Sequence, residues 1–93
     1  MTYKLTDNNH TEIVKCFRDN GFSVVSLASL GKGVPDLIVG RDNCNYLVEV
    51  KNGAKAKLTP QQVKFSNDWL GQYTVIRSVE DIANNWTDIV IKK

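Results

Sequence analysis

The chain has 93 residues, of which 42% are hydrophobic and 24% charged, and its formal net charge is +2. These values are typical of one globular domain, and we assign residues 1–93 to it. No apolar run approaches the roughly 20 residues of a membrane helix. The polar N-terminus has no signal-peptide core, and the two cysteines belong to no zinc-binding pattern. We therefore expect an intracellular protein with reduced thiols, neither secreted nor membrane-bound.

The first expected element is a helix over residues 9–20. Asn9 is placed as its N-cap, Glu12 three residues later completes a capping box, and Gly21 ends it. The following stretch, FSVVSLAS at residues 22–29, is rich in β-branched and apolar residues and predicts a strand.

A β-hairpin is expected next, after the turn sequence GKGVP at residues 31–35. Its strands are DLIVGR at 36–41 and YLVEVK at 46–51, joined by a turn at 42–45. The two glycines of GKGVP suit either the turn geometry or the close approach of a phosphate backbone.

A second helix follows the loop at residues 52–58. Thr59 is its expected N-cap, Pro60 its first residue, and Gln62 the partner in a T-x-x-Q capping box. Gly71 ends it, and one helical face is marked by Val63, Ser66 and Leu70.

The last expected elements are a strand over 73–78, a short helix over 79–86 and a terminal strand or tail over 88–93. The order is αβββαβ plus an extension. The second helix is a crossover, so the fourth strand can lie parallel to the third in a mixed central sheet flanked by helices. The predicted class is therefore α/β.

Three charged residues stand in the hairpin where its strands are most hydrophobic. Alternation places Glu49 and Lys51 on one face, and Asp36 at the head of the partner strand can meet them. Converging carboxylates need a cation or water, and Mg²⁺ takes one or two carboxylates together with phosphate oxygens. The alternative is a wet hairpin face on which Glu49 and Lys51 form a minor surface pair.

The stretches VPDLIVG, YLVEVK and KLTPQQVKFSNDWLGQYTVIRSVED together resemble the VRR-NUC (virus-type replication-repair nuclease) domain. That domain belongs to the PD-(D/E)xK superfamily of restriction-endonuclease-like nucleases, whose core is also αβββαβ. The resemblance covers roughly residues 9 to 81 and implies a Mg²⁺- or Mn²⁺-dependent enzyme that hydrolyses phosphodiester bonds in DNA. It also implies a viral or mobile-element origin.

The resemblance assigns a role to each matching residue. Asp36 and Glu49 become metal ligands, with the Val50 carbonyl as an additional oxygen. The implied catalytic lysine, motif glutamine and accessory acid are Lys51, Gln62 and Glu12. Helix capping is the competing explanation for Gln62 and Glu12, and Gln61 is the adjacent rival of Gln62.

DNA contacts need positive charge near these residues. Five cations flank the predicted site in sequence: Lys32, Arg41, Lys55, Lys57 and Lys64. With no module for base readout, the chain is predicted to be a structure-selective endonuclease. Family resemblance favours a homodimer that resolves four-way (Holliday) junctions. The alternatives are a nuclease for flaps, nicks or linear duplex and a non-catalytic DNA-binding module. Trp86 and the final residues are a candidate dimer surface, although core packing also explains them.

Overall fold

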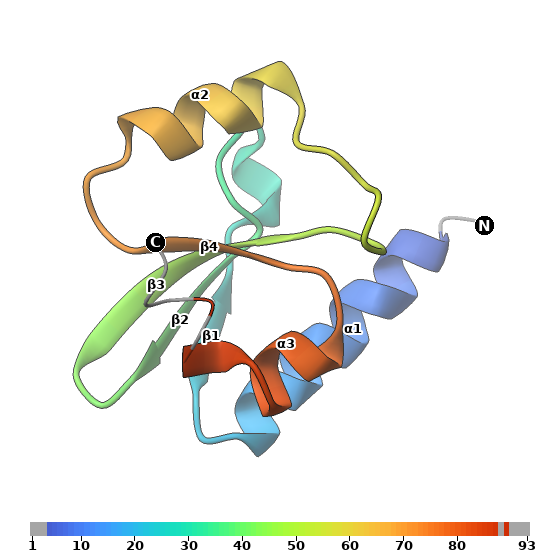
Figure 1. Ribbon diagram of the computed structural model, residues 1–93, viewed down its shortest axis with the longest axis vertical. Coiled ribbons are helices and arrows are strands. Elements are labelled where there is room, and N and C mark those ends of the chain that lie inside the picture. Colours follow the sequence, from blue (N-terminus) through green and yellow to red (C-terminus); the bar gives the residue numbers. More distant parts are fainter. Residues whose placement is uncertain (1–3, 88, 90–93) are drawn as a thin grey trace.

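The structure, a computed structural model, describes residues 4–87 and 89 (Figure 1). Its elements confirm the predicted αβββαβ order and the α/β class. A 3₁₀ turn, η1, follows the first strand, and a further helix follows the last. The bounds are α1 Lys4–Asp19, β1 Ser23–Ser26, η1 Ala28–Leu30, β2 Leu37–Arg41, β3 Cys44–Val50, α2 Pro60–Asp68, β4 Tyr73–Ile76 and α3 Val79–Ala83.

The four strands form a mixed sheet in the order β1-β2-β3-β4, as predicted. β1 and β3 both pair antiparallel with β2, and β4 pairs parallel with β3. The parallel pair exists because α2 carries the chain back across the sheet before β4 begins. Leu37 lies opposite Val48, and Val48 lies opposite Thr74, which fixes the face of every other strand residue.

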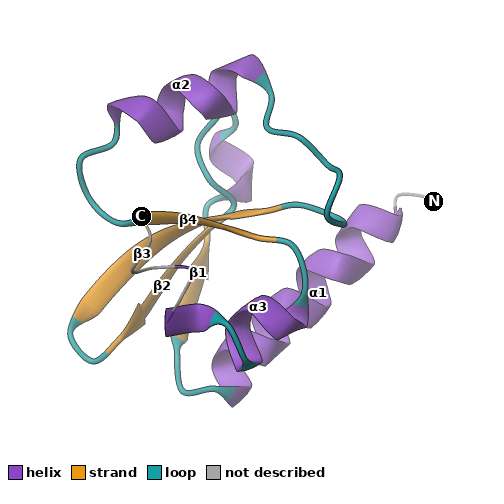
Figure 2. Cartoon of the chain, in the orientation of Figure 1, coloured by secondary structure: helices purple, strands orange, loops and turns teal. Residues whose placement is uncertain are grey.

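The hydrophobic core lies between the sheet and the layer formed by α1 and α3 (Figure 2). Alternate residues of β2, β3 and β4 enter this core, and α1 contributes one apolar stripe. Its fully buried members are Ile13, Phe17, Leu37, Val39, Val48 and Ile76.

Trp86 completes this core from the C-terminal side. Its ring makes edge-to-face contacts with Phe17, Phe22 and Tyr46, at centroid distances of 5.4, 5.1 and 5.0 Å. Only 7% of Trp86 is exposed. The structure therefore supports the core-packing explanation for Trp86, and its place in a dimer surface is wrong.

The opposite face of the sheet carries α2, which packs on it sparsely (Figure 1). The prediction of an apolar helical face marked by Val63 and Leu70 is wrong, because Val63 is 42% and Leu70 99% exposed. Phe65 is instead the aromatic residue nearest the sheet, with its ring centroid 6.2 Å from that of Tyr73. α2 contributes none of the buried residues.

The first helix begins earlier than predicted, at Lys4, so Asn9 and Glu12 lie inside it and form no N-terminal capping box. No proline or glycine stands before Gly21 to stop the helix from extending towards the N-terminus. Several other elements are shorter than predicted. β1 ends at Ser26, α2 at Asp68 and α3 at Ala83.

The hairpin turn consists of two residues, Asp42 and Asn43, with φ angles of 56° and 65°. This geometry matches the right-handed twist of the flanking strands, and aspartate and asparagine tolerate it better than most residues. β3 therefore starts at Cys44, two residues earlier than expected.

The predicted terminal strand or tail at residues 88–93 lies outside the described residues, apart from Ile89. Within the described part of the chain, no helix is long and apolar enough to cross a membrane.

The core position of Trp86 predicts a large loss of stability in Trp86→Ala. Removing a buried aromatic side chain leaves a cavity, so we expect the free energy of unfolding to fall by about 3–5 kcal/mol. Urea unfolding followed by circular dichroism measures this loss. Leu70→Ala is the matched control and should change the free energy of unfolding by less than about 0.5 kcal/mol. Equal unfolding midpoints in wild type and Trp86→Ala would contradict the assignment.

Candidate active site

A pair of carboxylates lies where β2 begins beside the end of β3. Asp36 directly precedes β2, and its Oδ2 atom accepts a hydrogen bond of 2.9 Å from the Val50 backbone N–H. The Asp36 carbonyl oxygen also accepts a hydrogen bond of 2.7 Å from the Leu27 N–H. The strand register places Asp36 across from Glu49, so the predicted meeting of the two carboxylates is present.

Glu49 is a charged residue that the fold buries almost completely. It lies on the α2 face of β3 and is 2% exposed. Its Oε2 atom accepts a hydrogen bond of 3.0 Å from the Gln62 side-chain amide. Its Oε1 atom is buried and has no hydrogen-bond partner among the described residues. A buried oxygen without a donor is costly, and this one can accept a ligand.

Burial and the nearby Asp36 carboxylate together raise the pKa of Glu49 to about 8, while Lys51 opposes the shift. Two carboxylates this close cannot both ionise freely. In the metal-free protein at neutral pH, the pair therefore retains a proton. A strongly shifted pKa of this kind is common at functional sites.

Tyr73 is a neighbour of the pair that the sequence reading missed. It is buried at the start of β4, and burial together with Glu49 and Asp36 raises its pKa to about 12. Its register partner in the parallel pairing is Leu47, so Tyr73 shares the α2 face with Glu49. Only the register between β3 and β4 places Tyr73 beside Glu49, and the sequence of neither strand alone predicts that register.

Gln62 forms the predicted capping box and also contacts Glu49, while its role as the motif glutamine stays a prediction. Its backbone N–H donates to the Thr59 hydroxyl at 3.2 Å, and its side-chain oxygen accepts from the Thr59 N–H at 2.9 Å. This is the predicted capping box. The amide nitrogen of the same side chain donates to Glu49. The cap thus holds the amide in the orientation that contacts the carboxylate.

Gly33 places the GKGVP loop directly against the first turn of α2. A Cβ atom at Gly33 would lie 2.7 Å from the Gln61 carbonyl oxygen, and the φ angle of Gly33 is 82°. The backbone that approaches Gly33 closely is therefore that of Gln61 in this chain. Gly31 also has a positive φ of 63°, but the space around it is open.

Lys51 directly follows β3, and α1 contacts the chain there. The Lys51 N–H donates to the Ile76 carbonyl at 2.9 Å, and the Lys51 carbonyl accepts from the Asn9 side chain at 3.3 Å. The positive charge of Lys51 is close enough to lower the pKa of Glu49. Lys51 therefore joins the carboxylate pair as predicted from the strand alternation.

Glu12 lies elsewhere on α1. It is exposed and lines a hollow between α1 and α3 together with Lys15, Cys16 and Val79. The structure does not bring Glu12 together with Asp36 and Glu49, and Asn9 is the α1 residue that contacts the end of β3. Its role as an accessory acid stays a prediction.

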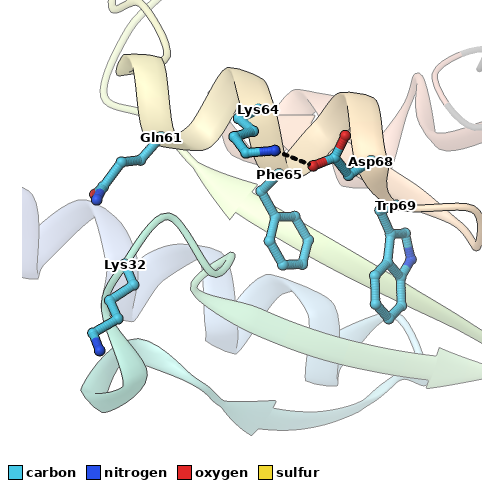
Figure 3. A pocket seen from close by; sticks show the side chains of 6 residues that line it. All are labelled: Lys32, Gln61, Lys64, Phe65, Asp68 and Trp69. Atoms are coloured by element: carbon cyan, nitrogen blue, oxygen red, sulfur yellow. Dashed lines mark hydrogen bonds and ion pairs between the residues drawn. The ribbon is translucent and has the colours of Figure 1, made fainter.

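Two of the five predicted DNA-binding cations line a groove beside α2 (Figure 3). We call it the α2 groove. It has a volume of about 360 Å³ and is lined by Lys32, Gln61, Lys64, Phe65, Asp68 and Trp69. Lys64 forms an exposed ion pair of 2.7 Å with Asp68.

Lys55 and Lys57 are exposed on the loop between β3 and α2, which begins at Lys51 and ends at Thr59. This loop is anchored by Arg77, a residue that the sequence reading did not single out. The Arg77 guanidinium donates to the carbonyl oxygens of Gly53 and Ala56. Arg77 is therefore a positioning residue for the lysine-bearing loop.

Arg41 is a predicted DNA-binding cation that the structure places away from the carboxylate pair. It ends β2, whereas Asp36 precedes the start of that strand. Its guanidinium donates to the Asn20 carbonyl at 2.9 Å and lies 4.1 Å from the centroid of the Phe22 ring. These contacts give Arg41 a packing role at the hairpin end opposite the site.

The donor set available to a metal consists of two carboxylates and backbone oxygens. Among the described residues, no group of three or more histidine, cysteine, aspartate or glutamate side chains gathers. Mg²⁺ and Mn²⁺ suit such a sparse oxygen site, because Mg²⁺ keeps several waters and binds through one or two carboxylates. The unpartnered Oε1 of Glu49 fits this use.

The mixed sheet, the α2 crossover and the carboxylate pair define a restriction-endonuclease-like domain. The family model of the VRR-NUC domain matches residues 1–73, which are 73 of the 93 residues. The chain therefore belongs to the VRR-NUC family, a family of nucleases. Comparison with curated proteins finds no significant match.

The proton on Glu49 predicts how stability depends on pH in the metal-free protein. The folded protein keeps this proton up to about pH 8, whereas an unfolded chain releases it near the ordinary value of 4.5. Raising the pH between these values therefore favours the unfolded chain, and the free energy of unfolding should fall. Glu49→Gln, which cannot ionise, should remove most of that fall.

Urea unfolding in EDTA, at about pH 5 and about pH 9, measures the effect. Glu80→Gln, at an exposed site on α3, is the matched control and should behave as the wild type does. If Glu49→Gln loses stability with pH as steeply as the wild type, Glu49 is not the group responsible.

The double role of Gln62 predicts different effects for two substitutions. Thr59→Ala removes one cap acceptor and should cost about 1 kcal/mol of stability while nuclease activity is retained. Gln62→Ala removes the cap and the contact with Glu49, so it should cost a similar amount of stability and also lower activity. If the two variants lose equal activity at equal stability, the Gln62–Glu49 contact has no functional role.

Proposed function

We propose that this protein is a Mg²⁺- or Mn²⁺-dependent, structure-selective DNA endonuclease that acts inside cells. The observation that carries the proposal is the buried Glu49 carboxyl group, with its unpartnered Oε1 atom, beside the half-buried Asp36 and Lys51 in a chain of the VRR-NUC family. A surface ion pair would not account for a glutamate that is 2% exposed.

Asp36, Glu49 and the Val50 carbonyl are the groups that would hold the metal. A bound divalent cation supplies polarisation of the phosphate and a lowered pKa for the attacking water. The Lys51 ammonium donates hydrogen bonds to the phosphate and offsets the charge that develops on it. Gln62 keeps the Glu49 carboxylate in place through its amide.

DNA is held by lysines around this site. Lys55 and Lys57 lie on the anchored loop, and Lys32 and Lys64 lie at the α2 groove. Such cations contact phosphates and position the duplex without reading its sequence. Arg41 is not included, because its guanidinium packs on Phe22 at the opposite end of β2.

We favour four-way junctions as the substrate and a homodimer as the active form. A chain of 93 residues buries a modest fraction of its surface, so association would add stability. A two-fold dimer presents two active sites to two symmetric strands of a junction. Flaps, nicks and linear duplex ends are the alternative substrates. A non-catalytic DNA-binding module is the alternative function, and such a module has no need for a buried glutamate beside a second carboxylate.

The test is incubation with an immobile four-way junction, a flap, a nicked duplex and a linear duplex. We expect paired cuts in the junction with Mg²⁺ or Mn²⁺ and none in EDTA. Asp36→Asn and Lys51→Ala should lower the cleavage rate about 100-fold or more, because each removes a group that contacts the reacting centre. Light scattering after size-exclusion chromatography should give the mass of a dimer.

Each part of the proposal has an outcome that contradicts it. Cleavage that continues in EDTA or in Asp36→Asn would rule out the metal mechanism. Strong flap cutting with asymmetric or absent junction cutting would replace the junction with a flap. Folded, DNA-binding protein without any cleavage would favour the non-catalytic module. Full cleavage by Glu12→Gln would remove Glu12 from the active site.

A further inference from the structure

The α2 groove begins at the same turn of α2 that carries the contact with Glu49. Gln61 lines the groove, and the next residue, Gln62, contacts Glu49. From Gln61 the groove follows α2 as far as Trp69 (Figure 3). Eight residues at a helical rise of 1.5 Å make this length roughly 12 Å.

Trp69 forms a fixed aromatic surface at the far end of the groove. Its ring stacks on Phe65, with a centroid distance of 5.5 Å and an interplanar angle of 15°. A Cβ atom at Gly71 would lie 2.8 Å from the indole Nε1, so only glycine leaves room for the ring in this position. Yet Trp69 remains 43% exposed. The ring thus packs on Phe65 while the residue stays partly exposed and accessible to a ligand.

The charges around the groove favour an anionic ligand. Lys32 stands across the groove from α2 (Figure 3) and forms no ion pair with a described residue. Lys64 is already neutralised by Asp68. Lys32 lies at the Gln61 end of the groove and Trp69 at the other end (Figure 3). A single strand lying along the groove can therefore place a phosphate on the cation and a base on the ring, which are the two contacts that single-stranded nucleic acids use. The volume of about 360 Å³ also falls within the usual range of ligand sites.

A second copy of the chain is the competing occupant. The most exposed apolar residues of this region are Leu70 and Leu30, and neither lines the groove. The groove itself combines the aromatic ring of Trp69 with the cation of Lys32 and begins at the turn of α2 next to Gln62. These observations favour a nucleotide over another apolar surface.

We propose that the α2 groove binds a short unpaired segment of the DNA substrate, with one base stacked on Trp69 and a phosphate further along the strand held by Lys32. The inference rests on the proposed function and deepens it. In a duplex the faces of each base are covered by its neighbours. A branch point or a single-stranded arm can expose an unpaired base to stack on the indole ring. Trp69 is then a specificity-determining residue that favours DNA with unpaired nucleotides over linear duplex.

Binding is measured with a fluorescein-labelled oligothymidylate of about 8 nucleotides, by anisotropy on the full chain in EDTA. Trp69→Ala should weaken binding about 5- to 100-fold, the range for loss of one stacked base. Trp69→Phe should restore most of the affinity, and Lys32→Ala should weaken binding and reduce its salt dependence. Leu70→Ala is the matched control beside Trp69 and should bind as the wild type does.

Tryptophan emission provides a second measurement. Trp86 is buried, so quenching by the oligonucleotide in wild type reports on Trp69 and should vanish in Trp69→Phe. In the cleavage assay, Trp69→Ala should slow cutting of a flap or junction more than cutting of linear duplex. Circular dichroism checks that each variant is folded.

Equal oligonucleotide affinity in wild type and folded Trp69→Ala would overturn the inference. So would a Trp69→Ala variant that becomes monomeric while its oligonucleotide affinity is unchanged, because the groove would then be an interface between copies. Asp36→Asn separates the two proposals. It should abolish cleavage yet keep the oligonucleotide affinity, so failure of the metal mechanism leaves the binding result intact.

Discussion

The buried carboxyl group of Glu49 is the constraint on which the rest of the site depends. A carboxylate removed from water is unfavourable unless donors or a cation accompany it. The fold provides one donor, the Gln62 amide, and places the competing carboxylate of Asp36 across from it. The metal-free protein therefore holds a proton at Glu49. In the function we propose, a divalent cation replaces that proton, so metal affinity should increase as the pH approaches 8.

The first turn of α2 links this constraint to the fold. Its capping box fixes where the helix begins, and the same glutamine fixes the position of Glu49. Gly33 allows the loop before β2 to pack against the backbone of this turn. Because α2 contributes no buried residue, these local contacts hold it more than a hydrophobic face does. The helix is thus positioned from its N-terminus, next to the carboxylates.

Features that depend on local chemistry could be predicted from the sequence. The mixed sheet followed from a crossover helix, the Asp36–Glu49–Lys51 grouping from strand alternation, and the capping box from its spacing. Features set by tertiary packing were not accessible. Arg41 is close to Asp36 in the chain, but the length of β2 separates them. Tyr73 joins the site through a register between two strands that are distant in sequence. The long N-terminal extension of α1 has no cap signal that marks its start.

The edge-to-face packing of Trp86 has a consequence for how this domain can be moved between proteins. The match to the family ends at Tyr73, but the layer that seals the aromatic residues of α1 and of the β1 region comes after it. A fusion or chimera that ends at Tyr73, where the family match ends, would leave Phe17 and Phe22 without their contacts with Trp86. The smallest transplantable unit is therefore defined by its aromatic cluster and extends at least to residue 86.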